Sequence, residues 1–398
     1  MSINAIVAGF ATYSKLQSSH DDDRIDRLNH LYTVTILVVF AIFVGGGQYV
    51  GTPIECTHST QPDAALRTYA KTYCWVANTY YVPMKNELPS NIIRRESLEL
   101  SYYQWVPIIL LFMALLFKLP SICWRLLSGA SGIDLDKIVS LTLESQMGDH
   151  TRHRETVQQI ADYMDRWLDA HRQYHWNVMV RIRQKISKLC CFCFGKRHGC
   201  YLSGLYLVVK LGYSINVISQ FFILNRIMGG WWNIFGMEIL TGLTNTRERR
   251  ESPYFPKVTL CDFEIRQLNN LQRWTFQCVL PINLFNEQIF SFLWFWFIFV
   301  ACMTIFSFGL WVARAIVRNS RSRYVRKFLK AQGELTGEED KRLADRFADH
   351  YLRDDGIFVL RVVAKNSNNV VISDLLLQLW RLYKSKPLVR TGADEVLV

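Results

Sequence analysis

Residues 288–313 read QIFSFLWFWFIFVACMTIFSFGLWVA, and this stretch contains no charged side chain. A helix needs about 20 mostly apolar residues to cross the hydrocarbon core of a bilayer. The surface helix of a soluble protein would show one apolar stripe instead, with polar residues on its opposite face. The stretch therefore predicts a membrane-spanning helix.

Three further blocks lead to the same prediction. Residues 31–51 carry no charge, and residues 104–124 carry one. Residues 201–227 are less apolar, but without a span here one loop would enclose a long, charge-poor apolar block. The polar side chains of this block include Lys210, Ser214 and Asn216. We predict an all-α membrane protein with four transmembrane helices per subunit.

The polar side chains of the third span cannot face lipid at low cost. They should therefore face the interior of the helix bundle or water. For Lys210 a second interpretation is equally open, because its long stem can carry the amine to the membrane surface. The pattern alone does not choose between the two.

Lys and Arg are divided unevenly among the segments outside the spans. Residues 1–30, 125–200 and 314–398 hold 32 of them, against 11 in residues 52–103 and 228–287. The positive-inside rule assigns the more basic side to the cytoplasm. Both termini are therefore expected in the cytoplasm, and residues 52–103 and 228–287 are expected as the two extracellular loops.

The formal net charge of +12 is compatible with nucleic acid as a partner, with an anionic membrane surface, or with neither. No zinc-finger spacing, RNA-binding motif or basic zipper accompanies it, and basic residues crowd the cytoplasmic ends of the spans. We therefore expect membrane lipids, and no nucleic acid, as partners. The chain also lacks a phosphate-binding glycine loop, a nucleophile elbow and an embedded acid pair, so we expect neither an enzyme nor a cofactor.

The chain has ten cysteines, and two of them fall in each expected outer loop. An even number on the oxidising side of a membrane indicates disulfide bonds. The four are Cys56, Cys74, Cys261 and Cys278. They permit three pairings, and their spacing does not choose among these. The cytoplasmic group Cys190, Cys191, Cys193 and Cys200 fits no standard zinc spacing, so we expect no metal site.

The segments assigned to the cytoplasm show helical patterns. At the N-terminus Ile3, Ile6, Val7 and Phe10 form one apolar stripe. Such a stripe suits a helix lying on the membrane surface or a helix tucked into a pore mouth, and both interpretations remain open.

The C-terminal segment also has a folded pattern. Residues 336–339 form a helix-start signature, residues 357–363 predict a strand or a buried segment, and residues 374–383 predict another helix. The terminal Val396-Leu397-Val398 would fit a PDZ-type groove by strand addition, although short apolar termini are common.

Four stretches carry a family resemblance. Residues 102–107 read YYQWVP before the second span, residues 255–263 read FPKVTLCDF, residues 278–287 read CVLPINLFNE, and residues 355–366 read DGIFVLRVVAKN. Together with two cysteines in each outer loop, where connexins have three, they resemble the innexins, the gap-junction family of invertebrates. The similarity covers nearly the whole chain.

This resemblance implies several structural features. Subunits would form a ring around a central pore, and an N-terminal helix including Ser2, Ile3, Asn4 and Ile6 would line its cytoplasmic constriction. The outer loops would hold a small sheet tied by Cys56–Cys278 and Cys74–Cys261. Residues 125–200 and 314–398 would form a helical cytoplasmic dome. The ring would dock to another on the adjacent cell, at a plasma-membrane junction.

One stretch departs from the family pattern. Thr57 and Leu66 stand where family members usually have Trp, and Arg67 and Lys71 stand at positions that are often acidic. We expect these basic side chains to make the outer mouth of a pore less favourable to cations.

Two functions follow as hypotheses. The first is a structural subunit of a gap junction channel or hemichannel that passes ions and small molecules passively between adjacent cells. The alternative is a four-span adhesive or scaffolding protein without a conducting pore. The polar third span favours the channel, since adhesion needs no polar groups in the bilayer. Dye transfer between paired expressing cells distinguishes the two.

Overall fold

The structure is a computed structural model of the 398-residue chain. It describes residues 22–57, 64–145, 150–170, 199–228, 236, 254–317, 319–386, 388–391 and 394–397, the last two ranges by their backbone only. The chain divides into two compact units. The sheet unit comprises Leu28–Leu119 and Ser214–Met303, and the tail unit comprises Met1–Arg27, Pro120–Tyr213 and Thr304–Val398.

In the part of the chain that the structure describes, four helical segments are long and apolar enough to cross a membrane, which confirms the predicted number of spans. They are Arg24–Tyr49, Val106–Ser131, Tyr201–Ile227 and Pro281–Ile316. The bilayer core offers no water to peptide groups, so a spanning segment must satisfy its own hydrogen bonds, and a helix does so locally.

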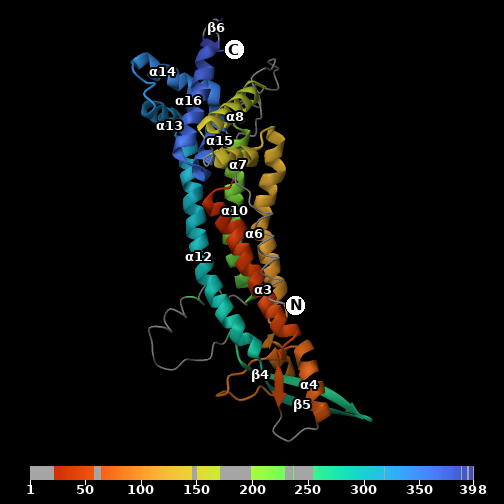
Figure 1. The fold of residues 1–398 in the computed structure, drawn as a ribbon. Coiled ribbons are helices and arrows are strands. Elements are labelled where there is room, and N and C mark those ends of the chain that lie inside the picture. Colours follow the sequence, from red (N-terminus) through yellow and green to blue (C-terminus); the bar gives the residue numbers. More distant parts are fainter. Residues whose placement is uncertain are drawn as a thin grey trace, which may run out of the picture. The chain divides into compact units, whose positions relative to one another are not determined.

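The first span is composite. It consists of α2 (Arg24–Arg27), a π-helical turn (Leu28–Thr33) and α3 (Val34–Tyr49). The other three are α6 (Val106–Ser128), continued by a short 3₁₀ turn to Ser131, α10 (Tyr201–Ile227) and α12 (Pro281–Ile316), labelled in Figure 1. Each of these three helices runs from one unit into the other.

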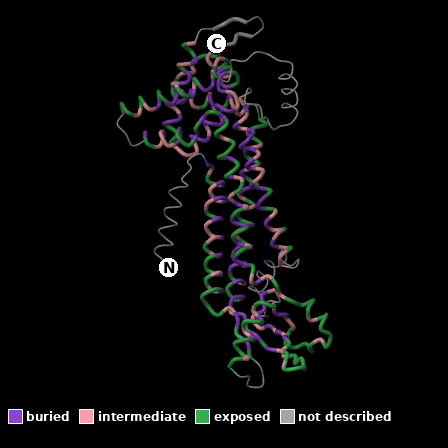
Figure 2. The backbone as a smooth tube through the Cα atoms, turned by 90° about the vertical axis from the view of Figure 1, so that its right-hand side faces the viewer, coloured by how far each residue is buried: buried purple, intermediate pink, exposed green. Residues whose placement is uncertain are grey.

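The helices of the sheet unit pack around a core of aliphatic and aromatic side chains. Leu37, Val44, Leu110, Leu293 and Phe297 are fully buried there. Lipid tails are as apolar as leucine, so this packing gains van der Waals contact rather than a hydrophobic driving force. The same helices expose other apolar side chains along their length, and Figure 2 shows this alternation of buried and exposed positions. Such an outer surface suits lipid.

The sheet unit also contains a five-stranded antiparallel sheet with the strand order β1-β5-β4-β2-β3. Its long hairpin is β4 (Val258–Gln267) and β5 (Asn270–Val279). The short strands are β1 (Glu55–Thr57), β2 (Thr79–Tyr80) and β3 (Glu99–Leu100). Two helices, α4 (Ala64–Val76) and α5 (Ile92–Glu96), complete this part. The small sheet implied by the resemblance is thereby confirmed.

The tail unit is mostly helical. It contains α7 (Leu135–Ser145), α8 (His150–Ala170), α13 (Asn319–Ala331), α14 (Glu338–Arg346), a π-helical turn (Phe347–Leu352), α15 (Arg353–Asn366) and α16 (Asn369–Ser385). A hairpin of β6 (Leu388–Thr391) and β7 (Asp394–Leu397) follows. Leu375, Leu379 and Trp380 of α16 are fully buried in the core of this unit.

The strand predicted as one option for residues 357–363 is wrong, because these residues lie in α15. Ile357, Val359 and Val363 are buried there, as the other option stated. A β-branched residue costs a helix less than about 1 kcal/mol. Burying its side chain contributes about 1.5–3 kcal/mol. Tertiary burial therefore outweighs the local preference for a strand.

The helix predicted to start near residues 336–339 is α14, which begins at Glu338. The Thr336 hydroxyl donates to the Asp340 carboxylate at 3.0 Å, and the Gly337 N–H donates to it at 3.3 Å. Asp340 thus bonds donors that precede the helix, as in a capping box. The helix predicted over residues 374–383 is part of α16.

Candidate functional site

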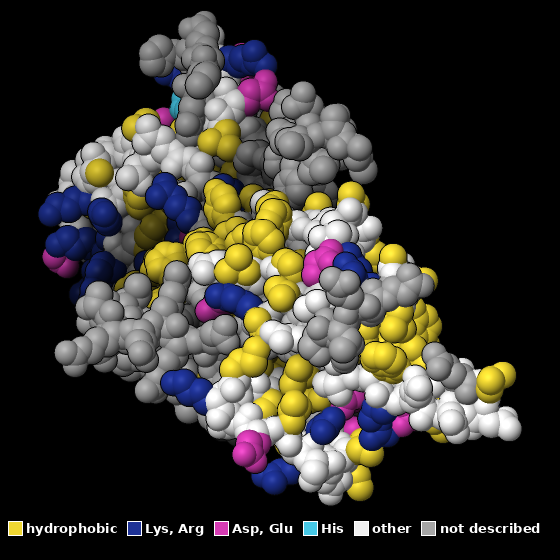
Figure 3. All heavy atoms as spheres, turned by 90° about the horizontal axis from the view of Figure 1, so that it is seen from below, with side chains coloured by type: hydrophobic (Ala, Val, Ile, Leu, Met, Phe, Trp, Pro, Cys, Tyr) yellow, Lys and Arg dark blue, Asp and Glu magenta, His cyan; other side chains and the backbone are white. Residues whose placement is uncertain are grey.

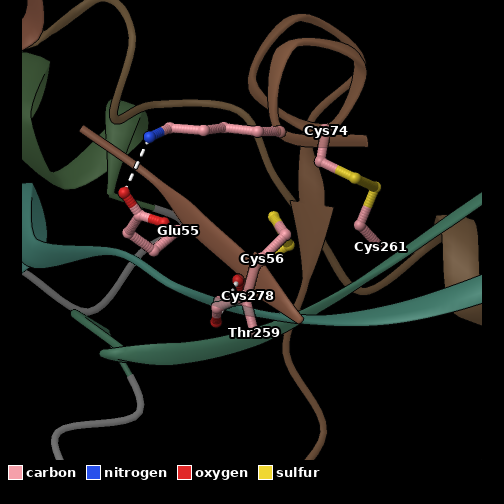
Figure 4. The surroundings of a disulfide bond; sticks show 7 residues. Glu55, Cys56, Cys74, Thr259, Cys261 and Cys278 are labelled. Carbon is pink, nitrogen blue, oxygen red and sulfur yellow. Dashed lines mark hydrogen bonds and ion pairs between the residues drawn. A yellow bond between two sulfur atoms is a disulfide. The ribbon is translucent and has the colours of Figure 1, made fainter. Parts of the chain in front are cut away.

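Two disulfides join the segments expected as outer loops. The bonded pairs are Cys56–Cys278 and Cys74–Cys261, the pairs that the family resemblance implied, and Figure 4 shows them near each other. The two cysteines of the first pair lie 222 residues apart in the sequence, and those of the second pair lie 187 residues apart. Closing chain segments of this length removes much conformational entropy from the unfolded chain, worth about 5 kcal/mol for a single bond in the chain-entropy description.

The strand register explains the first pairing. Cys56 of β1 lies directly opposite Cys278 of β5, with the two Cα atoms 4.0 Å apart. The sulfur atoms of Cys56, Cys74 and Cys278 also lie within 4.8 Å of one another. A cluster of this kind resembles a metal site, but cysteines oxidised to disulfides lack the thiolate that binds a metal.

The stretch FPKVTLCDF is tied to the first loop by polar contacts as well. The Asp262 carboxylate accepts from the Arg95 guanidinium at 2.7 Å and from the Tyr80 hydroxyl at 3.0 Å. Burial is the main reason why the pKa of Tyr80 rises to about 12, so this hydroxyl stays a donor near neutral pH. Asp262 therefore joins three separate segments of the sheet unit.

The stretches resembling innexin motifs also contact one another. The Asn283 side chain donates to the Pro256 carbonyl at 3.0 Å, and the Tyr102 hydroxyl donates to the Tyr254 carbonyl at 2.6 Å. Lys257 pairs with Glu287 at 3.4 Å. These bonds fix how the sheet continues into α12, so the stretches at residues 102–107, 255–263 and 278–287 have a structural role here.

Arg67 and Lys71, the candidate outer-mouth residues, both lie on α4. Arg67 is exposed. The Lys71 amine lies 2.7 Å from the Glu55 carboxylate, and neither group is fully buried. A pair of this kind contributes little stability, but it neutralises the Lys71 charge locally. The positive charge of Lys71 is therefore partly offset at its own position on α4.

Lys210 of α10 lies inside the tail unit with a fully buried side chain. Its amine is 2.7 Å from the Asp26 carboxylate and 3.4 Å from that of Asp23, and it donates to the Ser307 hydroxyl at 2.9 Å. A lysine in an apolar bundle requires such counter-charges, because an isolated buried ion is very costly. The amine thus points into the bundle rather than to the surface.

The network around Lys210 extends into the C-terminal helices. The Lys365 amine of α15 lies 2.5 Å from the Asp23 carboxylate, and the Arg27 guanidinium donates to the Asn366 side chain at 3.1 Å. The Tyr206 hydroxyl donates to Asp26 at 2.6 Å. Burial alone would raise the pKa of Asp23, but Lys210 and Lys365 outweigh it and hold the pKa at about 2. The start of the first span is thereby bonded to α10 and α15.

Our prediction from the sequence did not include Asp23, Asp26 and Lys365 in this network. A signal was present, because a lysine within a span needs a carboxylate near it and an acidic run precedes the first span. The lysine on α15 had no such signal. Its separation from Asp23 is 342 residues.

The remaining candidate residues are placed as follows. Ser214 and Asn216 lie on α10 within the sheet unit, largely buried, and the Asn216 side-chain oxygen accepts from Gln220 at 3.1 Å. Ser2, Ile3, Asn4 and Ile6 lie outside the described residues, as do Cys190, Cys191 and Cys193 and the side chains of Val396–Val398.

Asp355 forms a second buried link within the tail unit. Its carboxylate accepts from the Ser203 N–H at 3.0 Å in the first turn of α10, and its own N–H donates to the Gly199 carbonyl at 2.7 Å. Gly199 has a φ of +62°, and a Cβ there would lie 2.7 Å from the Arg353 side chain. Burial raises the pKa of Asp355 to about 6, although the N–H groups in the first turn of α10 favour the charged form of its carboxylate.

Replacing Lys210 with Met should destabilise the protein strongly, because Asp26 would remain buried without its counter-charge. The expected loss is about 3–5 kcal/mol in the free energy of unfolding. The measurement is thermal unfolding of the purified protein in detergent. Lys137→Met, at an exposed site of the same unit, should leave the midpoint unchanged. Adding Asp26→Asn to Lys210→Met should recover part of the loss, and a further decrease would contradict the assignment.

Replacing Asp355 with Asn should remove part of the pH dependence of stability. The pKa is about 6 in the folded chain against an ordinary value of 3.8. The folded state therefore binds the proton more tightly, and stability is lost as the pH rises from 4 through 6, by at most about 3 kcal/mol. Unfolding midpoints at pH 5 and 7.5 should differ less in Asp355→Asn. Glu155→Gln, at an exposed carboxylate of the same unit, should keep the wild-type difference.

The chain was compared with known protein families and known proteins over its whole length. The family model for innexins matches residues 22–383. The chain is 40% identical over 380 residues to innexin unc-9 of Caenorhabditis elegans, with 94% of this chain and 95% of that relative covered. It is 35% identical over 395 residues to innexin-19 of Caenorhabditis briggsae, with 94% and 89% covered.

Innexin-3 of Caenorhabditis elegans is 34% identical over 361 residues, with 90% of this chain and 83% of that relative covered. The matched region contains all four candidate spans in full, both disulfides and the buried lysine network. The chain is therefore a multi-pass membrane protein that belongs to the innexin family, whose members form gap junction channels.

Proposed function

We propose that the chain is a structural subunit of a gap junction channel or hemichannel, through which ions and small molecules pass passively between adjacent cells. The observation that carries this proposal is the match to the innexin family over residues 22–383. Like subunits would form a ring in the plasma membrane. Passage through such a ring needs no catalytic group, since selectivity follows from pore width and lining charge.

The position of the pore lining belongs to the same proposal. Ser2, Ile3, Asn4 and Ile6 would line the cytoplasmic constriction, as the resemblance implies. The segment that follows them is bonded to α10 and α15 through Asp23, Asp26 and Arg27. These bonds would hold the base of an N-terminal helix in place, which is what a constriction of constant width requires.

Docking to a ring on the neighbouring cell is supported by the form of the sheet unit. The tip of the β4–β5 hairpin exposes Leu268 and Leu271 to solvent. Two disulfides and the Asp262 contacts hold the base of this hairpin. A rigid element with an exposed apolar tip suits contact with another protein.

Expression in paired cells without junction proteins of their own tests the proposed function. Pairs in which both cells express the chain should show junctional conductance and transfer of a small dye. Pairs in which only one cell expresses it should show neither, because a ring in one membrane opens to the medium and not to the second cell.

The adhesive alternative makes a different prediction for the same cells. Expressing cells would then aggregate, and neither current nor dye would cross between them. Surface labelling should first establish that the protein reaches the plasma membrane. Adhesion without conductance, in cells with labelled protein at their contacts, would exclude the channel.

We also propose that Arg67 and Lys71 reduce cation entry at the outer mouth of the pore. Arg67→Glu and Lys71→Glu each make the local charge more negative by two units per subunit. The cation-to-anion permeability ratio should therefore rise in both variants. The change should be larger in dilute salt, since the screening length is about 30 Å at 0.01 M and about 10 Å at 0.1 M.

A charge-neutral change provides the matched control for this selectivity test. Lys71 pairs with Glu55, so Lys71→Gln combined with Glu55→Gln removes one charge of each sign. The permeability ratio should then stay at the wild-type value. Unchanged reversal potentials in Arg67→Glu and Lys71→Glu would reject an outer-mouth role for both residues.

A further inference from the structure

Helix α13 has one face made of basic side chains and another made of buried apolar ones. Val325 and Leu329 are fully buried in the core of the tail unit. Arg323, Lys327 and Lys330 are exposed. Residues spaced by three and four positions share a face of a helix. The buried side chains therefore fix the rotation of α13 and set these three charges together on its outer face.

Ion pairs divide the basic residues of this helix into two groups. Arg321 pairs with Asp354 at 2.7 Å, and Arg326 forms a two-point pair with Asp345. No acidic side chain of the described residues pairs with Arg323, Lys327 or Lys330. The first group thus holds α13 against its own unit, whereas the second group is available to a ligand.

The outer face of α13 also borders a hollow. This hollow has a volume of about 410 Å³ and is lined by Ser322, Arg323, Arg326, Lys327 and Lys330. Figure 3 shows Lys and Arg side chains gathered at the left edge of the molecule, the side toward which α13 runs off from α12 in Figure 1. A concave basic surface of this kind suits an anion with several oxygens.

The position of α13 in the chain indicates where that anion comes from. The fourth span, α12, ends at Ile316 and α13 begins at Asn319. Ile316 and Val317 are 67% and 49% exposed, so the apolar surface suited to lipid continues to the end of the span. A basic segment directly after a spanning helix lies at the level of the lipid headgroups, where anionic lipids attract it.

We propose that the outer face of α13, formed by Arg323, Lys327 and Lys330, binds the phosphate headgroups of anionic phospholipids in the cytoplasmic leaflet. This inference rests on the cytoplasmic side assigned to the tail under the proposed function, but it does not require that the ring conducts. The headgroup phosphates occupy the hollow and contact the three charges. The acyl chains lie along the exposed apolar surface at the end of α12.

Lipid retention by the purified full-length protein tests this site. The protein in detergent is incubated with phosphatidylinositol 4,5-bisphosphate, phosphatidylserine or phosphatidylcholine, and bound lipid is counted by native mass spectrometry. Each basic side chain near an anionic surface strengthens binding about fivefold, so Arg323→Gln/Lys327→Gln/Lys330→Gln should bind the anionic lipids on the order of 100-fold less tightly. Binding of phosphatidylcholine should not change.

Two further variants separate local charge from other effects. Lys137→Gln/Arg154→Gln/Arg166→Gln removes the same number of charges from exposed sites on α7 and α8 and should bind lipid like the wild type. Arg323→Lys/Lys327→Arg/Lys330→Arg keeps the charge and should also keep the binding. Equal losses in both neutralised triple variants would overturn the proposal, because a general charge effect would then explain the retention.

A soluble competitor tests the source of the phosphate. Inositol 1,4,5-trisphosphate carries the headgroup phosphates without acyl chains and should displace the lipid only at far higher concentration. Displacement at equal concentration would overturn the lipid assignment in favour of a soluble phosphate ligand. Loss of the oligomer in lipid-free Arg323→Gln/Lys327→Gln/Lys330→Gln would overturn it in favour of contact with a second copy of the chain.

Discussion

A peptide group in the hydrocarbon of a bilayer has no water to bond, so each spanning segment must satisfy its own N–H and C=O groups. Helices do this within the segment, and the four spans of this chain are helices for that reason. The same constraint acts on side chains. A lysine on α10 can remain within the bundle only where carboxylates meet it, and Asp26 and Asp23 do so.

The buried pairs around Lys210 connect three parts of the chain that lie far apart in the sequence. The Asp23 carboxylate accepts from the Lys365 amine and also lies near the Lys210 amine. One carboxylate therefore links the N-terminal segment, the third span and the C-terminal helices. Buried ion pairs of this kind often add little net stability compared with apolar packing. Their value here would lie in register, because this arrangement of the three segments places Lys210 and Lys365 each beside a carboxylate.

In the sheet unit, disulfide bonds rather than ion pairs hold distant parts of the chain together. Helix packing in a bilayer lacks the hydrophobic driving force that stabilises a soluble core. Outside the bilayer the sheet is small, and a small core rarely supplies much stability by itself. Two disulfides across the sheet compensate for this, and Asp262 adds polar bonds to Arg95 and Tyr80. A rigid hairpin results, without a large buried core.

Four properties could be predicted from the amino-acid sequence: the four spans, the extra polarity of the third span, the two pairs of loop cysteines and the family resemblance. These properties are local, since helical hydrogen bonds, span length and motif letters all lie within short stretches of chain. Local patterns do not predict every element. The β-branched run at residues 357–363 favours a strand by itself, but burial in the tail unit makes it part of helix α15.

Other properties depend on the packing of distant segments and could be seen only in the folded chain. They are the partners of Lys210 and of Asp355, the pairing of Lys71 with Glu55, and the exposure of the charges of α13. Tyr206 and Asp26 are separated by 180 residues, and Lys365 and Asp23 by 342. No periodicity extends over such separations. Electrostatic and covalent partners are selected by distance in space, and the packing of distant segments sets that distance.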